Sequence, residues 1–286
     1  MRILLTGADG FIGTNLQKFS SCETVPFSFS RGDIDAIDFA GIDAVVHLAA
    51  LVHRMDPPQE SEYFRINCDR SVALAEKAKA AGVKLFVFMS TVKVYGEESD
   101  LPYTEESPCC PIDPYGSSKL RAEQMLRSLE DNAFKVAVVR APLVYGEGVK
   151  ANMLNLIRLV ERLPFLPFGS VNNMRSMVYV GNLAHLVTEI IRQHKSGVFL
   201  AADDEPVSTA RLSGCIARAM GKKARLIPCP PLKSLLRIFK PALYRRLYSN
   251  LYVDNRKTVE TLRLKNPYSF DDGIKKMVGF YRKNQT

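Results

Sequence analysis

The sequence predicts an α/β fold, in which a doubly wound parallel sheet is followed by a smaller C-terminal α/β lobe. Short apolar runs recur along the first half of the chain, at 2–6, 24–29, 44–48, 85–90 and 136–140. Stretches with helical spacing of apolar residues, such as 67–81 and 117–129, separate several of these runs. Strands that alternate with helices need crossover connections, and these give a parallel sheet covered by helices on both faces.

Length, composition and charge limit the classes of protein to which this chain can belong. It has 286 residues, of which 47% are hydrophobic and 24% charged, the balance of an ordinary globular protein. The six cysteines lack Cys-x-x-Cys spacing, so we expect reduced thiols and no metal site. The net charge of +9 suits anionic partners. We expect no nucleic acid among them, because neither aromatic platforms nor a recognised basic fold is visible.

The sequence also bears on location. No apolar run reaches the roughly 18 residues that span a bilayer, so we expect no integral membrane segment. Met1 leads directly into the first predicted strand, without a separate signal segment. The expected location is therefore the cytoplasm.

The first strand, 2–6, runs through a glycine-rich turn into a helix. Gly7 and Gly10 would let the backbone turn sharply and approach a pyrophosphate, and Gly13 would let helix and strand pack closely. The N-terminus of the helix offers N–H groups and the positive end of its dipole to phosphate. Between a strand and a helix, these glycines predict a dinucleotide-binding turn, and the sheet is expected to be of Rossmann type.

The residues after the second strand bear on the choice of cofactor. An acidic residue at this place binds the ribose hydroxyls of NAD, whereas an arginine suits the 2′-phosphate of NADP. Ser30 and Arg31 come first, which favours NADP(H). Asp33 is the alternative contact to ribose or adenine, which leaves NAD(H) open.

The fourth strand and the helix after the next loop carry a chemical set. Thr91 follows Ser90 at the end of the strand, and ligands of doubly wound sheets bind beyond the carboxyl ends of strands. Tyr115 and Lys119 stand at i and i+4, on one face of the predicted helix. A nearby cation favours the phenolate, so this pair could move a proton on a sugar hydroxyl or ketone. Alone, such a pair is common on solvated helices.

Beyond Gly146 the pattern loosens, with a helix-like segment at 152–163 and a proline-rich turn at 164–167. We expect a dinucleotide-binding domain over 1–150 and a lobe over 151–286 that mainly binds substrate, with the chain crossing back near 176–190. Residues 221–250 hold eight lysines and arginines and no acidic residue. Solvated helices are the expected form of this stretch, and contact with a membrane surface or an anionic substrate is the alternative.

Several motifs follow one another in order along the chain. They are Thr6-Gly7-x-x-Gly10-x-x-Gly13, His47-Leu48-Ala49-Ala50 with Asn67, Ser90-Thr91-Val92-Lys93-Val94-Tyr95-Gly96, Pro114-Tyr115-Gly116-x-Ser118-Lys119 and Arg140-Ala141-Pro142-Leu143-Val144-Tyr145-Gly146. Together they cover nearly the whole chain, and they resemble the extended short-chain dehydrogenase/reductases that modify nucleotide sugars. That group holds UDP-hexose 4-epimerases, 4,6-dehydratases and 4-ketoreductases.

The resemblance implies roles for individual residues. Tyr115 would donate or accept the proton, Lys119 would bind the nicotinamide ribose and lower the pKa of Tyr115, and Thr91 would hydrogen-bond the reacting sugar oxygen. The implied cofactor-binding residues are Gly7, Asp9, Gly10, Phe11, Ile12, Gly13, Ser30, Arg31, Asp33, Ile34, Leu48, Ala49, Ala50, Asn67, Ser90, Tyr115, Lys119, Ala141 and Leu143. The implied substrate-binding residues are Thr91, Val92, Lys93, Asn152, Arg175 and Arg246. His47 is expected to be a packed residue at a strand end.

Departures from the family pattern bear on the reaction. No Asp-Glu pair follows Thr91, which disfavours dehydration. Val92-Lys93-Val94 and the string 143–150 look more like the reductases of UDP-4-keto-6-deoxy-N-acetylhexosamines. We therefore expect NAD(P)H-dependent reduction of the C4 ketone of a nucleotide-linked 4-keto-6-deoxy hexose or N-acetylhexosamine, with UDP as the first choice of nucleotide. This reaction would serve the synthesis of surface polysaccharide precursors.

Two alternatives stay open. One is a UDP-hexose or UDP-N-acetylhexosamine 4-epimerase with tightly bound NAD. The other, from a different class, is a non-catalytic regulatory protein that binds NADP(H). The expected partner is a nucleotide sugar, and a homodimer is left open.

Overall fold

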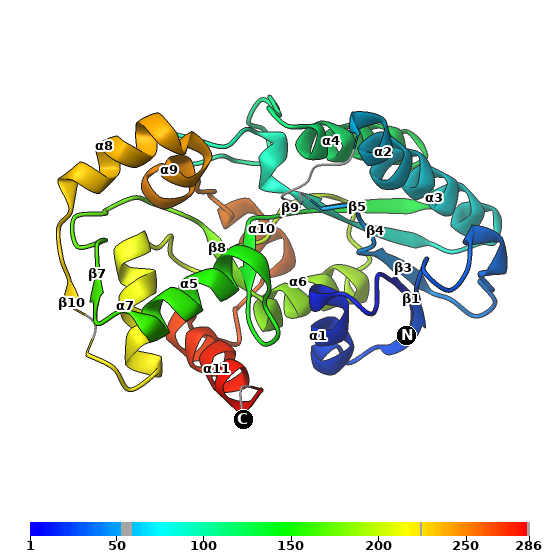
Figure 1. The fold of residues 1–286 in the computed structure, drawn as a ribbon. Helices are drawn as coiled ribbons and strands as arrows, with labels where there is room; N and C mark the ends of the chain where they lie inside the picture. The colour runs from blue at the N-terminus through cyan, green and yellow to red at the C-terminus, as the bar shows by residue number, and fades with distance from the viewer. Residues whose placement is uncertain (53–58, 224, 285–286) are drawn as a thin grey trace.

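The structure, a computed structural model, describes residues 1–52, 59–223 and 225–284. Its larger part is a parallel sheet of six strands in the order β2-β1-β3-β4-β5-β9 (Figure 1). The strands are β1 (Arg2–Thr6), β2 (Glu23–Phe27), β3 (Ala44–His47), β4 (Leu85–Thr91), β5 (Lys135–Ala141) and β9 (Gly197–Leu200). Each predicted apolar run is a strand of this sheet. The predicted doubly wound α/β fold is confirmed.

Helices from different parts of the chain cover the two faces of the sheet. They are α1 (Phe11–Phe19) and α6 (Val180–Arg192) on one face, and α3 (Arg70–Ala80) and α4 (Pro114–Ser128) on the other (Figure 1). In β4, Val87 and Met89 pack toward α6, whereas Phe86 and Phe88 pack toward α3 and α4. Strands buried on both faces need apolar residues at every position, which is why these runs showed no alternation.

The order of the strands reverses at β1, which has β2 on one side and β3 on the other. At such a reversal the loops leave the sheet in opposite directions and open a crevice at the carboxyl ends of the strands. The predicted strand 24–29 ends early, at Phe27, because the chain turns over the next residues, where Arg31 N–H donates to Ser28 O at 3.0 Å.

The second lobe is built mainly from helices. Its elements are α5 (Ala151–Arg162), α7 (Thr209–Ala219), α8 (Pro230–Phe239), α9 (Pro241–Tyr248) and α11 (Phe270–Lys283), with the short parallel pairs β6 (Leu143–Tyr145) with β8 (Met177–Tyr179) and β7 (Phe165–Leu166) with β10 (Arg225–Leu226). Ile157 of α5, Ile216 of α7 and Met277 of α11 meet in one apolar core. No helix in the described ranges is long and apolar enough to cross a membrane.

The chain crosses between the two parts more than once. After β8 it returns to form α6 and β9, so Leu183, Val187 and Phe199 pack in the core of the large sheet. It returns again with α10 (Arg256–Leu262), whose Leu262 lies in the core beneath the sheet. The C-terminal lobe is therefore made from separate stretches of chain, and the chain passes between it and the large sheet more than once.

A buried ion pair fastens α4 to the sheet. The carboxylate of Glu123 on α4 accepts hydrogen bonds from Arg140 on β5, from Nη2 at 2.6 Å and from Nε at 3.1 Å. Ser90 on β4 donates its hydroxyl to the same carboxylate. Arg140 also donates from Nη1 to the Tyr95 hydroxyl at 2.6 Å. A buried charge is tolerated only when it is paired in this way, so the position of α4 against the sheet is tightly defined.

Breaking this pair from one side should cost much more than removing both partners. In Glu123→Leu the Arg140 guanidinium stays buried without its counterion, and we expect a loss of about 3–5 kcal/mol in the free energy of unfolding. The double variant Glu123→Leu/Arg140→Leu should recover much of that loss, because apolar side chains can replace a whole buried pair. Urea denaturation of both variants measures the difference. Equal losses would show that packing at Glu123, rather than its charge, holds the helix.

Candidate active site

The glycine turn lies between β1 and α1, at the reversal of strand order. Gly7 has φ of +70°, and a Cβ at this position would lie 2.7 Å from the backbone nitrogen of Ala49. A Cβ at Gly13 would lie 2.3 Å from the Gly7 carbonyl oxygen. Because Gly10 is the N-cap residue and has no side chain, α1 starts without a side-chain cap. Its first N–H groups are therefore suited to phosphate, and the turn fits a dinucleotide pyrophosphate.

Arg31 lies beside this turn. Its guanidinium is 3.6 Å from the Asp9 carboxylate, and both side chains are exposed. Exposed pairs of this kind contribute little, so Arg31 can take up an anionic ligand at small cost. Asp33, in contrast, accepts the Ile34 N–H at 2.8 Å and caps a short 3₁₀ turn. Ser30 shares a hydrogen bond of 2.9 Å with the Ser28 hydroxyl.

Asn67 joins the loop after β3 to α4. The predicted helix 67–81 begins earlier, as α2 (Glu60–Phe64), and is interrupted by a π-helical turn, Arg65–Asp69. In that turn Asn67 accepts the Leu51 N–H at 2.7 Å and donates to Leu51 O at 3.0 Å and to Ser118 Oγ at 3.1 Å. Such π turns occur frequently at functional sites. Leu48, Ala49 and Ala50 follow β3, next to the glycine turn.

His47 is a structural residue, as expected. It is fully buried at the end of β3, with the Thr6 hydroxyl 2.6 Å from Nδ1 and the Ser71 hydroxyl 2.9 Å from Nε2. Burial, with smaller contributions from Lys119 and Arg70, lowers the pKa of His47 to about 3. The imidazole therefore stays neutral and fully hydrogen-bonded.

The three predicted catalytic residues gather around the carboxyl end of β4. Thr91 ends the strand and accepts the Lys93 N–H at 3.3 Å. α4 begins beside it, capped by Asp113, which accepts the Gly116 N–H at 2.6 Å. A Cβ at Gly116 would lie 2.9 Å from Lys93 O, so the first turn of α4, with Tyr115, sits against the segment that follows Thr91.

Lys119 lies one turn further along α4 and is 1% exposed. Its ammonium donates to Met89 O at 2.9 Å and lies 4.3 Å from the centre of the Phe88 ring. Burial lowers the pKa of Lys119 to about 7, against the opposing charge of Glu123. The buried ammonium is thus poorly compensated in this arrangement.

Tyr115 departs from the expectation that Lys119 lowers its pKa. Burial raises the pKa of Tyr115 well above the ordinary value of 10, and the charges of Asp113 and Tyr63 add to the effect. Lys119 directs its hydrogen bond to the Met89 carbonyl instead. The phenol is therefore held in its protonated form at neutral pH.

Lys93 and Val92 follow Thr91 in different surroundings. Lys93 donates to Glu97 at 2.8 Å and to Asp113 at 2.5 Å. Burial acts to lower the pKa of Lys93, but the hydrogen bonds to Asp113 and Glu97 outweigh it and raise the pKa. Val92 is buried in an apolar cluster, so its side chain serves packing, and the implied substrate contact finds no support in its position.

The implied substrate residues of the second lobe come together. Arg246 on α9 donates from Nη1 to Asn152 Oδ1 at 3.4 Å. Arg175 donates to Arg245 O at 3.4 Å and to Ser249 O at 3.2 Å, at the end of the same helix. Burial lowers the pKa of Arg175, Glu97 opposes this, and Arg246 adds to the lowering. Two neighbouring guanidinium groups suit an anion with several charged oxygens, such as a diphosphate.

The remaining predicted residues lie near the ends of β4 and β5. Ser90 is buried and its hydroxyl is engaged by Glu123, so its side chain faces α4 rather than a ligand. Ala141 ends β5 and is buried, whereas Leu143 at the start of β6 is exposed.

Sequence reasoning missed two groups of residues that shape the site. One is the network of Glu123, Arg140 and Tyr95, for which the arginine that ends the predicted strand 136–140 was the available signal. The other is Glu97, whose carboxylate lies 3.3 Å from Arg245 Nε on α9 and so links the turn after β4 to the second lobe. No local sequence pattern predicts the contact between Glu97 and Arg245.

The reversal at β1, the glycine turn and the Tyr115–Lys119 pair on α4 define the class, which is that of the extended short-chain dehydrogenase/reductases, enzymes that work with NAD(P). The model of the NAD dependent epimerase/dehydratase family matches residues 29–200, and the chain belongs to this family. The resemblance drawn from the motifs is confirmed.

Relatives with several activities share this fold. A UDP-glucose 4-epimerase of Vibrio cholerae is 36% identical, over 96% of this chain and 93% of the relative. The UDP-glucuronic acid 4-epimerase of Bacillus cereus in complex with NAD superposes with a TM-score of 0.79 at 23% identity and covers the whole of both chains. RMD of Pseudomonas aeruginosa, complexed with NADPH, gives a TM-score of 0.80 at 19% identity over 99% of each chain. The two structural likenesses speak for the fold.

The lowered pKa of Lys119 predicts a pH dependence of stability. In the folded protein Lys119 loses its proton near pH 7, whereas in the unfolded chain it keeps the proton up to its ordinary pKa of 10.5. The unfolded state binds more protons between these values, so the free energy of unfolding should rise with pH there, by up to about 1.4 kcal/mol per unit from this group.

The matched control is Lys119→Met, which keeps the length of the side chain and cannot titrate. We expect its stability, measured by urea denaturation without cofactor between pH 7 and 9, to rise less steeply than that of the wild type. Parallel curves for the two proteins would mean that Lys119 stays charged in the fold.

Proposed function

We propose that this protein reduces the C4 ketone of a UDP-linked 4-keto-6-deoxy hexose or N-acetylhexosamine with NADPH. The observation that carries the proposal is the segment after β2. Its residues are Ser28, Phe29, Ser30 and Arg31, none of them acidic, and Arg31 lies exposed beside the glycine turn. This arrangement suits the 2′-phosphate of NADPH, the form of the cofactor that reductases consume.

The chain holds groups suited to each part of the cofactor. Gly7, Gly10 and the start of α1 would bind the pyrophosphate, Arg31 the 2′-phosphate and Lys119 the nicotinamide ribose. When bound, NADPH would supply the hydride that reduces the ketone. A cofactor phosphate also brings negative charge, which favours the protonated form of a buried lysine.

Tyr115 would then protonate the sugar oxygen. As the C4 ketone becomes an alkoxide, O4 needs a proton and a hydrogen-bond donor, and Tyr115 and Thr91 lie around one strand end to provide them. The raised pKa of Tyr115 supports this direction of transfer, because a protonated phenol is the form that donates. An epimerase must first remove a proton from the C4 hydroxyl, and for that step it needs the phenolate.

Arg175, Arg246 and Asn152 would bind the diphosphate of the substrate. Their grouping at the end of α9 and the start of α5 supports a substrate with a nucleoside diphosphate. The sugar would then extend from this group toward the end of β4.

A 4-epimerase is the second candidate function. The observation in its favour is the 36% identity to the UDP-glucose 4-epimerase of Vibrio cholerae over nearly the full length of both chains. The same residues could serve this reaction, with the hydride returned to the sugar and the cofactor retained.

The deciding experiment follows the absorbance of NADPH when the enzyme meets a UDP-4-keto-6-deoxy-N-acetylhexosamine. We expect stoichiometric loss of NADPH. The variant Tyr115→Phe should lower turnover by about 10²–10⁴-fold while NADPH still binds. Ser128→Ala, at the far end of α4, is the control and should leave turnover unchanged. No loss of NADPH, in a preparation that interconverts UDP-glucose and UDP-galactose with bound NAD, would make the protein a 4-epimerase. NADPH binding without either turnover would make it a regulatory protein.

A second prediction concerns Arg31. In Arg31→Ala the charge-assisted hydrogen bonds to the 2′-phosphate are lost, so we expect the KM for NADPH to rise by about 10–100-fold and that for NADH to change little. Arg31→Lys should keep part of the preference, because it retains the charge without the fork geometry. Steady-state kinetics with both cofactors measure this. An equal change for NADPH and NADH would contradict the assignment of Arg31.

A further inference from the structure

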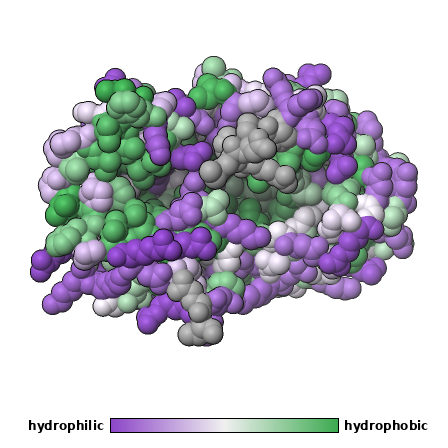
Figure 2. Space-filling view, viewed as in Figure 1, coloured by the Kyte–Doolittle hydropathy of each residue, from purple (hydrophilic) through white to green (hydrophobic). Residues whose placement is uncertain are grey.

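Exposed apolar side chains gather along one edge of the second lobe, which we call the apolar edge. Among the residues that the structure describes, it holds seven large apolar side chains that are at least 38% exposed: Leu163, Phe165, Ile227, Leu235, Ile238, Phe239 and Leu243. The parallel pairing of β7 with β10 brings their two stretches of chain together. Figure 2 shows apolar surface on this side of the molecule, over α8 and α9 and below them toward β7 and β10.

Helix α8 contributes the most exposed part. Leu235, Ile238 and Phe239 are spaced i, i+3 and i+4 and so share one face of the helix. Ile238 and Phe239 are each 72% exposed, whereas Leu236 is buried and attaches the helix to the lobe. A soluble monomer rarely leaves so many neighbouring apolar side chains in water unless they meet a partner.

Cations surround these apolar side chains. They are Arg162, Lys222, Lys223, Arg225, Lys233, Arg237 and Lys240, and the sequence from 221 to 250 has no acidic residue. Glu97 and Glu98 pair with Arg245 on α9, which is not one of these seven cations. All seven cations are exposed, although Lys222 also donates to the backbone carbonyl of Glu161, so the edge as a whole is both apolar and positive.

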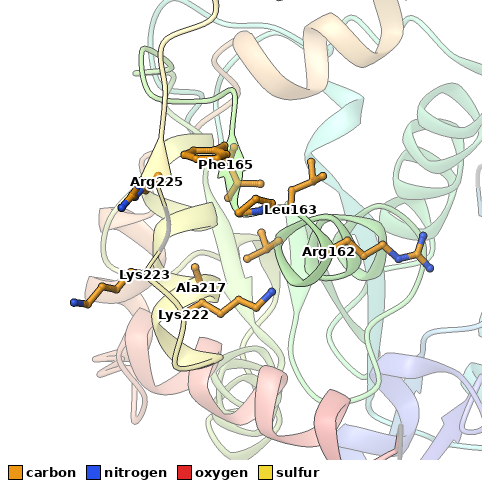
Figure 3. Close-up of a pocket in the computed structure, with 10 residues that line it drawn as sticks. Arg162, Leu163, Phe165, Ala217, Lys222, Lys223 and Arg225 are labelled. Atoms are coloured by element: carbon orange, nitrogen blue, oxygen red, sulfur yellow. The ribbon is translucent and has the colours of Figure 1, made fainter.

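A pocket of about 430 Å³ opens at the lower end of the apolar edge, between α5, β7 and the segment that leads into β10. Its wall is apolar at Leu163, Phe165 and Ala217, and Lys222, Lys223 and Arg225 stand at its rim (Figure 3). The Arg225 guanidinium lies 5.8 Å from the centre of the Phe165 ring, so cation and apolar surface are in contact. Cations therefore lie next to apolar surface at both ends of the edge, at this pocket and on α8.

We infer that the apolar edge is a docking surface for a bilayer that contains anionic phospholipids. Apolar side chains on one face of a short helix can enter the boundary between headgroups and acyl chains, while lysines and arginines meet the phosphates. This assignment explains the two features together, because a bilayer surface is at once apolar beneath and negative above.

A second copy of the chain fits the edge less well. In a symmetric dimer the same surface faces itself, so seven cations of one copy would meet the same seven of the other without an acidic partner in the segment. The inference does not depend on the reaction proposed above. The glycine turn and Tyr115 belong to the other part of the molecule, outside the docking surface.

The test is co-sedimentation of the full chain with vesicles. We expect binding to vesicles of equal parts phosphatidylglycerol and phosphatidylcholine, and weak binding to phosphatidylcholine alone. The apolar variant Ile238→Ser/Phe239→Ser should weaken binding by about tenfold or more. The charge variant Lys233→Gln/Arg237→Gln/Lys240→Gln should weaken binding about a hundredfold at low salt, since each of the three cations adds a similar factor to the affinity for an anionic surface.

Leu101→Ser is the matched control, because Leu101 is an exposed apolar residue (76%) outside the apolar edge. It should bind vesicles as the wild type does, and all variants should keep the NADPH affinity of the wild type in solution. Binding that survives both the apolar and the charge variants would place the membrane contact elsewhere and overturn the inference. Absence of vesicle binding by the wild type would also overturn the inference. Sedimentation velocity would then show whether the protein is a monomer or a dimer that Ile238→Ser/Phe239→Ser dissociates.

Discussion

The buried contact between Glu123 and Arg140 is the constraint on which the candidate site depends. It fixes α4 against β4 and β5, and α4 carries both Tyr115 and Lys119. The same carboxylate lies one helical turn from Lys119 and favours its charged form, against the larger effect of burial. Position and charge are thus coupled through one residue. A shift of α4 would move the Tyr115 phenol relative to Thr91. It would also change the electrostatic surroundings of the Lys119 ammonium.

Ion pairs extend this order from the sheet to the second lobe. Lys93, two residues after Thr91, is held by Asp113 at the start of α4 and by Glu97. Glu97 in turn meets Arg245 on α9, next to Arg246. The residues suited to proton transfer and those suited to a diphosphate are therefore connected by a few charged contacts, beside an apolar cluster that joins Val92 and Val94 to Leu251 and Val253. Contacts of this kind, part-buried and charged, set the orientation of α9 relative to the end of β4.

The sequence was sufficient where structure depends on neighbours in the chain. The strands and the glycine turn follow from local apolar runs and from backbone requirements at Gly7 and Gly13. It was insufficient where a side chain finds a distant partner. The engagement of Ser90 by Glu123 and the burial of Val92 depend on packing between distant parts of the chain. The direction of the pKa shift at Tyr115 was expected wrongly for the same reason, since a motif shows a nearby lysine but not the loss of water around the phenol.

Reduction and epimerisation at C4 use the same residues, so the residues alone do not separate them. The two reactions differ in their first proton transfer, for which a reduction needs a protonated phenol and an epimerisation needs a phenolate. A protonated phenol is ready to complete a reduction, whereas removal of the C4 hydroxyl proton requires that positive charge nearby first overcome the cost of burying a phenolate. Lys119, one turn from Tyr115 on α4, donates its hydrogen bond to Met89 O, and burial lowers the pKa of Lys119 itself to about 7. Burial of Tyr115 therefore favours the protonated phenol, the form that can donate a proton to an oxygen of the substrate.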